Sequence, residues 1–336
     1  MYIRQQAGER IILVIDRNVV SELLTMEACI PLMENVLSDL SAGQAEQQLR
    51  SVVPVRQGGL MGLMPAYLAS QEVVGAKLIS VFPHNHNRGL PSHQGVIALF
   101  DAENGAINAI VDGRNVTAIR TAAVSAAATK LLAREDSRVL ALIGTGEQAR
   151  THLEALLLVR PIKHVRIWSP NLEHATRFQK EMGAKYAELT IEISAAAQQA
   201  VAEADIICTL TSSTTPVLQG EWIPEGAHIN AVGACRAPDR ELATGVVRQA
   251  KLYVDRYESA VNEAGDYLIP LQEGAIGSDH IIGEIGQVLL GRAPGRASDK
   301  DVTLFKSLGL AVEDLAVASY LHEQAKLQGK GITIAI

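Results

Sequence analysis

Cysteine is scarce in this chain of 336 residues, and the chain has neither an excess of positive charge nor a long apolar run. The three cysteines, Cys29, Cys208 and Cys235, are far apart and form no CxxC pair, which argues against a disulfide scaffold and a zinc site. The formal net charge of −7 argues against nucleic acid or an anionic membrane surface as the main partner. No stretch approaches the roughly 20 apolar residues of a membrane span, and the polar N-terminus does not resemble a signal peptide. We therefore expect a globular cytoplasmic protein with free thiols.

Several catalytic signatures are absent as well. The chain contains no GxSxG, HExxH or P-loop lysine motif, so acyl transfer, zinc hydrolysis and P-loop phosphoryl transfer lack support. His84 and His86 are spaced like a pair of metal ligands, but no further ligand at a suitable spacing accompanies them. A polar loop is the favoured interpretation of this segment, and we expect no metal site.

The chain does contain 48% hydrophobic residues, which allows a large core in two domains. Its most informative stretch is the apolar run 138–143, which leads into Gly144-x-Gly146-x-x-Ala149. This order of strand, glycine turn and helix suits the pyrophosphate of a dinucleotide. The first glycine permits the turn, the second lets the backbone approach the phosphates, and the small third residue lets the helix pack on the strand. Strand and helix patterns then alternate, which predicts a doubly wound parallel α/β sheet with strands at 139–143, 164–168, 206–210, 229–232 and 252–254.

The end of the second of these strands bears on the choice of dinucleotide. An acidic residue there would bind the ribose 2′-hydroxyl of NAD, but the chain reads Ser169-Pro-Asn171, two candidate cofactor contacts without charge. Because no carboxylate repels a 2′-phosphate, NADP(H) is favoured, and NAD(H) is the alternative. Arg150, Arg166 or Arg177 could meet the phosphate, and the sequence does not choose among them.

The segments outside this alternation predict a second, mixed α+β domain. Residues 21–42 have helical periodicity, and an alanine-rich helix is predicted over 116–132. Between them lie short strand patterns typical of a mixed, mainly antiparallel sheet, at 50–55, 60–64, 73–81, 95–101 and 106–112. Later, 281–290 predicts a helix, and 303–328 predicts a strand and a long helix that return to the first domain. We expect one domain of residues 1–125 and 303–336 and a Rossmann dinucleotide-binding domain of residues 126–302.

Three basic residues lie in apolar or small-residue surroundings. Lys77 lies in the apolar run 73–81, Arg120 lies in the alanine-rich helix, and Arg50 precedes a strand pattern. Each has an ordinary alternative, because a strand lysine can extend its ammonium group into water and a helix arginine can lie on the surface. Taken together, they point to a pocket for an anionic substrate. His93, between a loop and a strand, is either a polar packing residue or a proton donor.

These residues and the motifs around them resemble the ornithine cyclodeaminase/mu-crystallin family over nearly the whole chain. The resemblance rests on Arg50, Lys77 and the segments 62–65, 91–94, 117–125, 143–149, 228–233 and 308–314. It implies a homodimer in which both chain ends form a substrate-binding and dimerisation domain. It also implies that Arg50, Lys77 and Arg120 bind the substrate, with Leu308 nearby. The cofactor, already expected at Gly144 and Gly146, would also contact Ser92, Thr121, Glu147, Gln148, Ser169, Thr211, Val232 and Ser307.

Two departures from the cyclodeaminase pattern bear on the activity. By resemblance, cyclodeaminases carry a glutamate at the position of Gly62 and a proton-carrying aspartate at the position of Cys235. Glycine has no side chain that could carry a proton, and a thiol with a reference pKa of about 8.5 is a poor substitute for a carboxylate. Asp239 lies four residues further on and is a candidate for partial compensation. The chain therefore looks more like the ketimine-reductase branch of the family.

We accordingly hypothesise hydride transfer from NAD(P)H to the C=N carbon of a small cyclic α-imino acid. Δ1-Pyrroline-2-carboxylate would give L-proline, and Δ1-piperideine-2-carboxylate would give L-pipecolate. Arg50 and Arg120 would hold the carboxylate and Lys77 would relay a proton, with His93 or water as a second donor. The alternatives are ornithine cyclodeaminase, an alanine dehydrogenase-like enzyme and a mu-crystallin-like NADPH-dependent ligand-binding protein. Retention of all three cations favours catalysis over ligand storage.

Overall fold

The computed structural model describes residues 11–335, apart from the side chains of Gln57, His86 and Asn87. The chain divides into two compact units, a terminal unit of residues 1–120 and 310–336 and a central unit of residues 121–309. Residues 1–10 and 336 of the expected first domain lie outside the described residues. The chain passes between the units after Arg120, inside helix α3 (Gly113–Leu132), and again between Gly309 and Leu310.

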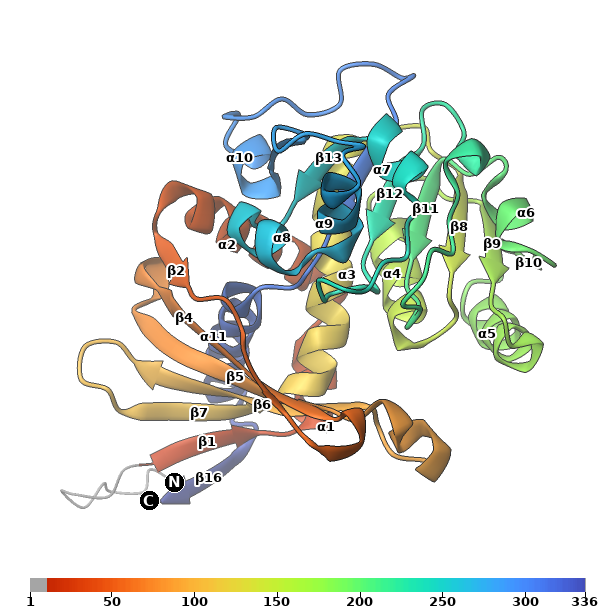
Figure 1. Ribbon diagram of the computed structural model, residues 1–336. Coiled ribbons are helices and arrows are strands. Elements are labelled where there is room, and N and C mark those ends of the chain that lie inside the picture. Colours follow the sequence, from red (N-terminus) through yellow and green to blue (C-terminus); the bar gives the residue numbers. More distant parts are fainter. Residues whose placement is uncertain (1–10, 336) are drawn as a thin grey trace. The chain divides into compact units, whose positions relative to one another are not determined.

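The terminal unit is built on one mixed sheet in the order β16-β1-β7-β6-β5-β4-β2, with β3 paired to β4 (Figure 1). All pairs are antiparallel except β1 with β7, which agrees with the expected mixed, mainly antiparallel sheet. The strands are β1 (Ile11–Ile15), β2 (Ala45–Gln47), β3 (Ser51–Pro54), β4 (Leu60–Leu68), β5 (Val73–Val81), β6 (His93–Asp101), β7 (Ile107–Asp112) and β16 (Ile332–Ala335).

Helix α11 (Ala311–Gln328) covers one face of this sheet, where it contacts β4, β5 and β6 (Figure 1). Side chains alternate between the two faces of a strand, so every second residue of each strand faces this helix. In β6 these residues include Ile97 and Leu99, which are fully buried. Lys77 of β5 pairs with Ile97 in the ladder and so points to the same buried face. A buried ammonium group on an apolar face needs a hydrogen-bonding or charged partner, which is described with the candidate site below.

The segment 21–42, expected as one helix, forms two. Helix α1 (Arg17–Leu23) ends before Thr25, and α2 (Met26–Ala42) begins after it. The hydroxyl of Thr25 accepts a hydrogen bond from the backbone N–H of Ala28, which is the standard capping contact of a new helix. The apolar periodicity continues across this cap, which explains why the pattern alone predicted a single helix.

The central unit is a parallel eight-stranded sheet in the order β10-β9-β8-β11-β12-β15-β13-β14. Leu140 and Leu142 of β8 face one hydrophobic core, and Ala141 and Ile143 face another, so helices cover both faces of the sheet. This is the expected doubly wound arrangement. The strands are β8 (Val139–Ile143), β9 (His164–Trp168), β10 (Thr190–Ile193), β11 (Ile206–Thr209), β12 (His228–Ala231), β13 (Lys251–Val254), β14 (Ile281–Glu284) and β15 (Thr303–Lys306).

The helices of the central unit connect these strands, together with the second part of α3. They are α4 (Glu147–Leu157), α5 (Leu172–Lys185), α6 (Ala197–Val201), α7 (Thr244–Gln249), α8 (Tyr257–Glu263), α9 (Gly265–Gln272) and α10 (Ile285–Leu289). Short 3₁₀ helices occur at Arg56–Gly58, Ala69–Gln71, Pro83–Arg88 and Gly220–Trp222. None of the helices within residues 11–335 is both long and apolar enough to cross a membrane.

Two expectations about the later part of the chain were wrong. The strand β15 (Thr303–Lys306), assigned from the sequence to the first domain, lies inside the central sheet between β12 and β13. All four of its residues are buried, as suits a parallel strand with neighbours on both sides. The segment 281–290 is a strand, β14, followed by the short helix α10, because the β-branched residues Ile281 and Ile282 belong to a strand that extends the sheet beside β13.

Candidate functional site

The glycine turn of the central unit has the geometry that a dinucleotide pyrophosphate requires. Gly144 has a φ of +111°, and a Cβ there would lie 2.7 Å from the carbonyl oxygen of Leu210, so only glycine fits. Gly146 caps α4 without a side-chain hydrogen bond, and a Cβ there would meet no described atom within 4 Å. The turn therefore leaves room beside the N-terminus of α4, which fits an anionic phosphate group. The Oε1 atom of Gln148, in the same turn, is buried without a hydrogen-bond partner among residues 11–335.

The end of β9 carries the two residues expected near the adenosine ribose. The hydroxyl of Ser169 accepts a hydrogen bond from the N–H of Asn171 at 3.3 Å. The side chain of Asn171 caps α5 by accepting from the N–H of His174 at 3.2 Å. The segment thus presents uncharged polar groups, as the sequence indicated.

Of the three arginines considered for a 2′-phosphate, two are engaged elsewhere in the central unit. Arg150 pairs with Glu181 at 2.5 Å and donates to the carbonyl oxygens of residues 145 and 146. Arg166 pairs with Glu203 at 2.6 Å. Arg177 is exposed on α5, and it is therefore the best of the three candidates for binding this phosphate.

Other expected cofactor residues lie along the carboxyl edge of the central sheet. Thr211 comes two residues after β11, Val232 directly follows β12, and Ser307 directly follows β15. In open α/β sheets, ligands bind outside the carboxyl ends of the strands. Glu147 is exposed at the first position of α4, and Thr121 is the first residue of the central unit.

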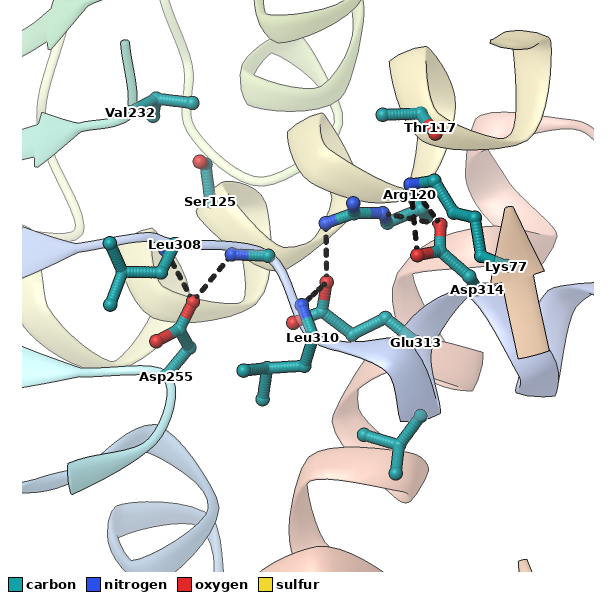
Figure 2. Close-up of polar contacts among 12 residues, drawn as sticks. Lys77, Thr117, Arg120, Ser125, Val232, Asp255, Leu308, Leu310, Glu313 and Asp314 are labelled. Carbon is teal, nitrogen blue, oxygen red and sulfur yellow. Dashed lines mark hydrogen bonds and ion pairs between the residues drawn. The ribbon is translucent and has the colours of Figure 1, made fainter. Parts of the chain in front are cut away.

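The terminal unit gathers two cations and two carboxylates into one buried cluster, Lys77, Arg120, Glu313 and Asp314 (Figure 2). The Nζ atom of Lys77 lies 3.1 and 3.0 Å from the two carboxylate oxygens of Asp314. Arg120 donates from Nε to Asp314 at 3.0 Å and from Nη1 to Glu313 at 2.6 Å. Asp314 therefore binds both cations, and its position in the first turn of α11 places it over the buried face of β5.

Glu313 also secures the start of α11. Its Oε2 atom accepts a hydrogen bond from the backbone N–H of Leu310 at 3.2 Å, as part of a capping arrangement (Figure 2). The same oxygen binds Arg120, so one carboxylate holds both a helix terminus and a cation. The orientation of the Arg120 guanidinium is thereby tied to the backbone of the helix.

Burial sets the protonation chemistry of Lys77. Burial lowers its pKa from 10.5 to about 8, while the nearby carboxylate of Asp314 opposes the shift and the positive charges of Arg120 and Arg50 add to it. A lysine in this range exchanges its proton near neutral pH and can act as an acid or a base. Arg50, half-buried just before β3, contributes a positive charge to the same region.

The structure separates His93 from this cluster. His93 is exposed at the start of β6, where its Nδ1 atom lies 3.0 Å from the hydroxyl of Ser92. In the ladder His93 pairs with Val81, whereas Lys77 pairs with Ile97, four residues along the strand. Four residues of strand span about 13 Å. The backbone of His93 therefore lies well away from that of Lys77, at the exposed start of β6.

Leu308, expected beside the substrate, is buried in the central unit. Its backbone N–H donates to Asp255 at 2.5 Å, and the N–H of Gly309 donates to the same oxygen at 2.9 Å (Figure 2). This buried carboxylate holds the segment that follows β15. The side chain of Leu308 joins the hydrophobic core on one face of the central sheet.

The two positions that distinguish the cyclodeaminase pattern carry no carboxylate here. Gly62 is buried on β4, and a Cβ there would lie 3.2 Å from the Cγ2 atom of Ile79. Cys235 donates from Sγ to the carbonyl oxygen of Val232 at 3.4 Å. Asp239, considered as a partial replacement, is paired with Arg236 at 2.6 Å.

The sequence reasoning missed Glu313 and Asp314 as members of the site. Both were within a motif that carried the resemblance, but acidic residues in the first turn of a helix are common because they complement the helix dipole. The sequence pattern that could have identified them is the apolar run 310–317, which these two acidic residues interrupt. Charged residues within such a run are expected to be buried and therefore paired, and the residues around them are buried in α11.

The fold and the site together define a dinucleotide-binding α/β protein with a buried lysine and arginine in its terminal unit. Residues 12–329 match the model of the ornithine cyclodeaminase/mu-crystallin family, and the chain belongs to this family. The mouse ketimine reductase mu-crystallin is 42% identical over 88% of this chain and 91% of its own length.

Two solved structures are similar over nearly the whole chain. The Thermococcus litoralis Δ1-pyrroline-2-carboxylate reductase in complex with NADH and L-proline has a TM-score of 0.94 at 38% identity, covering 96% of this chain and 100% of its own. An archaeal alanine dehydrogenase dimer with bound NAD has a TM-score of 0.91 at 31% identity, covering 97% of this chain and 99% of its own.

Proposed function

We propose that this protein is an NAD(P)H-dependent reductase of small cyclic α-imino acids, which converts Δ1-pyrroline-2-carboxylate to L-proline or Δ1-piperideine-2-carboxylate to L-pipecolate. The observation that carries the proposal is the buried Lys77–Asp314 pair beside Arg120. It offers a proton and positive charge without the extra carboxylates expected of a cyclodeaminase. The similarity to a mouse ketimine reductase and to a reductase structure holding NADH and L-proline supports it.

In this proposal the central unit binds the dinucleotide, which supplies the hydride when bound. The backbone of Gly144, Gly146 and the first turn of α4 would hold the pyrophosphate, because this turn fits a phosphate group. The remaining proposed contacts are Ser92, Thr121, Glu147, Gln148, Ser169, Asn171, Thr211, Val232 and Ser307.

The terminal unit would bind the imino acid. Arg50 and Arg120 would hold the carboxylate, and Lys77 would give a proton to the ring nitrogen. Leu308, a residue of the central unit, is the further substrate contact that we propose. Protonation makes the C=N carbon a better hydride acceptor, so a donor with a pKa near 8 suits a reaction at neutral pH. The ladder distance favours Lys77 over His93 as this donor. Glu313 and Asp314 would fix the directions of both cations.

We further propose a preference for NADPH over NADH. The uncharged end of β9 and the exposed Arg177 on α5 support it, whereas the two similar solved structures hold NADH and NAD. Dissociation constants for NADPH and NADH, measured by protein fluorescence, test this preference. Tighter binding of NADH would refute it.

A homodimer formed through the terminal unit is also proposed. The sheet face opposite α11 exposes neighbouring apolar side chains of three strands, including Met61, Leu63, Tyr67, Val74 and Val96. Apolar patches of this kind are typical of protein interfaces. The similar alanine dehydrogenase structure is a dimer.

The cytoplasm is the proposed compartment, which suits three cysteines that all carry free thiols.

The function is tested by incubating the purified protein with each cyclic imine and either NADH or NADPH. We expect the nicotinamide absorbance to fall and L-proline or L-pipecolate to accumulate in equal amount. An absence of oxidation with both imines and both cofactors would refute the reductase proposal. Ammonia released from L-ornithine would instead indicate a cyclodeaminase. Oxidation that requires a 2-oxo acid and free ammonium would indicate alanine dehydrogenase-like chemistry, which the similarity to the archaeal structure favours as the second candidate.

A further inference from the structure

Glu241 has a fully buried carboxylate that accepts four hydrogen bonds within the central unit. Its Oε1 atom accepts from the backbone N–H and the hydroxyl of Thr211, both at 2.7 Å. Its Oε2 atom accepts from the backbone N–H of Gly233 at 2.7 Å and from the hydroxyl of Thr209 at 2.9 Å. One side chain thus joins the loop that follows β11 to the loop that follows β12.

The two loops approach each other closely around this carboxylate. A Cβ at Gly233 would lie 2.1 Å from the carbonyl oxygen of Thr211 and 2.7 Å from the Glu241 carboxylate. Only glycine leaves room for this approach. The arrangement therefore depends on both a missing side chain at one position and a buried charge at the other.

The backbone of Glu241 is held in turn by Asp266, which forms an ion pair with Lys306. Asp266 accepts hydrogen bonds from the backbone N–H groups of Glu241 and Leu242, both at 2.9 Å. Its other oxygen lies 3.0 Å from the Nζ atom of Lys306, which also donates to the carbonyl oxygen of Ala231. Lys306 is the last residue of β15, so the network extends across three neighbouring strands. All three charged groups are buried.

The position of these loops in the sheet order indicates which part of a dinucleotide they meet. The pyrophosphate turn follows β8 and the ribose segment follows β9, which lies on one side of β8. Strands β11 and β12 lie on the other side. A dinucleotide spans the carboxyl edge of such a sheet, so its nicotinamide half would lie on the side of β11 and β12.

We propose that Glu241 is a positioning residue for the nicotinamide half of the dinucleotide site, where it holds the loops after β11 and β12 in their binding conformation. This inference rests on the proposed dinucleotide binding by the central unit. Glu241 itself is buried beneath the loops and acts through Thr211 and Gly233.

The substitution Glu241→Gln tests this role because it keeps the size of the side chain. Each carboxylate oxygen accepts a backbone N–H, from Thr211 or from Gly233. An amide has only one acceptor oxygen, and its NH₂ group would face the other N–H donor. The variant therefore releases one of the two loops and changes no residue of the pyrophosphate turn.

The measurement compares two ligands by calorimetry, NADH and ADP-ribose, which lacks the nicotinamide. NADPH and 2′-phospho-ADP-ribose replace them if the protein prefers NADPH. We expect Glu241→Gln to weaken binding of the whole dinucleotide about tenfold or more and to leave the affinity for the ADP-ribose unchanged. The control is Glu188→Gln, an exposed glutamate of the same unit, which should alter neither affinity.

Equal weakening of both ligands would overturn the proposal, because Glu241 would then support the whole unit. Unchanged binding of both would overturn it too. If Glu241→Gln does not fold, Thr209→Val removes one hydrogen bond to the same carboxylate with almost no change in shape, and a smaller selective loss of about threefold is expected. Failure of the wild-type protein to bind any dinucleotide would refute the proposed function instead.

Discussion

The Nζ atom of Lys77 and the carboxylate of Asp314 form an ion pair at 3.0 Å in which neither side chain exposes more than 2% of its surface. One residue lies on β5 and the other in the first turn of α11, 237 positions apart in the chain. The desolvation cost of burying a lysine is opposed here by a bidentate contact with a carboxylate. The pair sets the proton affinity of the one cation proposed to act as a proton donor.

Replacing Asp314 should move the pH dependence of the reaction. Lys77 donates a proton only while charged, so kcat/KM should fall as the pH rises above about 8. The Asp314 carboxylate raises the pKa of Lys77 against burial, Arg120 and Arg50, so Asp314→Asn lowers this pKa further. The basic limb of the pH profile should shift by about one unit or more to lower pH. The exposed Asp136→Asn serves as control, and an unmoved limb in Asp314→Asn would contradict the role of Lys77.

Removing Arg120 should lower the free energy of unfolding as well as the activity. Arg120→Met removes the cation that is paired with Glu313 and one of the two cations that are paired with Asp314, and an uncompensated buried charge costs about 3–5 kcal/mol. Adding Glu313→Gln should recover part of the loss, because it removes the buried negative charge that Arg120 balanced. Urea unfolding measures both effects, with the exposed Arg248→Met as control. No recovery in the double variant would show that Arg120 stabilises the unit by packing alone.

Two alanine substitutions in the glycine turn should separate folding from binding. Gly144→Ala forces a left-handed φ and a contact of 2.7 Å with the backbone of Leu210, so it should lower the melting temperature. Gly146→Ala has a compatible φ of −79° and open space, so the free protein should keep its stability. Its added methyl group occupies the space proposed for the phosphates, and dinucleotide affinity should fall about tenfold or more. Full affinity in Gly146→Ala would place the pyrophosphate elsewhere.

A charge on the outer face of the terminal sheet should break the proposed dimer. Leu63 lies on this face and is 40% exposed, so Leu63→Glu places a carboxylate in the centre of the apolar patch. Sedimentation at micromolar concentration should change from dimer to monomer, because an unpaired charge is costly to bury in an interface. Leu172→Glu, at an exposed leucine of the central unit, is the matched control and should stay dimeric. A dimeric Leu63→Glu variant would assign the interface to another surface.

The local patterns were sufficient for most of the central sheet. The strands β8 and β9 have the bounds expected from the sequence, because short apolar runs between glycine, proline and charged residues leave few alternatives. The pattern was insufficient for β15 and β14. A four-residue apolar segment is compatible with several structures, and its place is decided by the strands that pair with it. Strand β10, at the edge of the sheet, carries the partly polar sequence Thr-Ile-Glu-Ile and was not anticipated.

The sequence by itself determined the chemistry available to this protein: a glycine turn for a dinucleotide, three cations in apolar surroundings, and the absence of carboxylates at positions 62 and 235. Only the tertiary structure decided how the charges are used. It pairs Lys77 and Arg120 with Glu313 and Asp314 and places His93 well away from them. The physical reason is that spacing along one element reveals local periodicity, whereas charge pairing depends on which faces of distant elements meet, and burial strengthens each such pair.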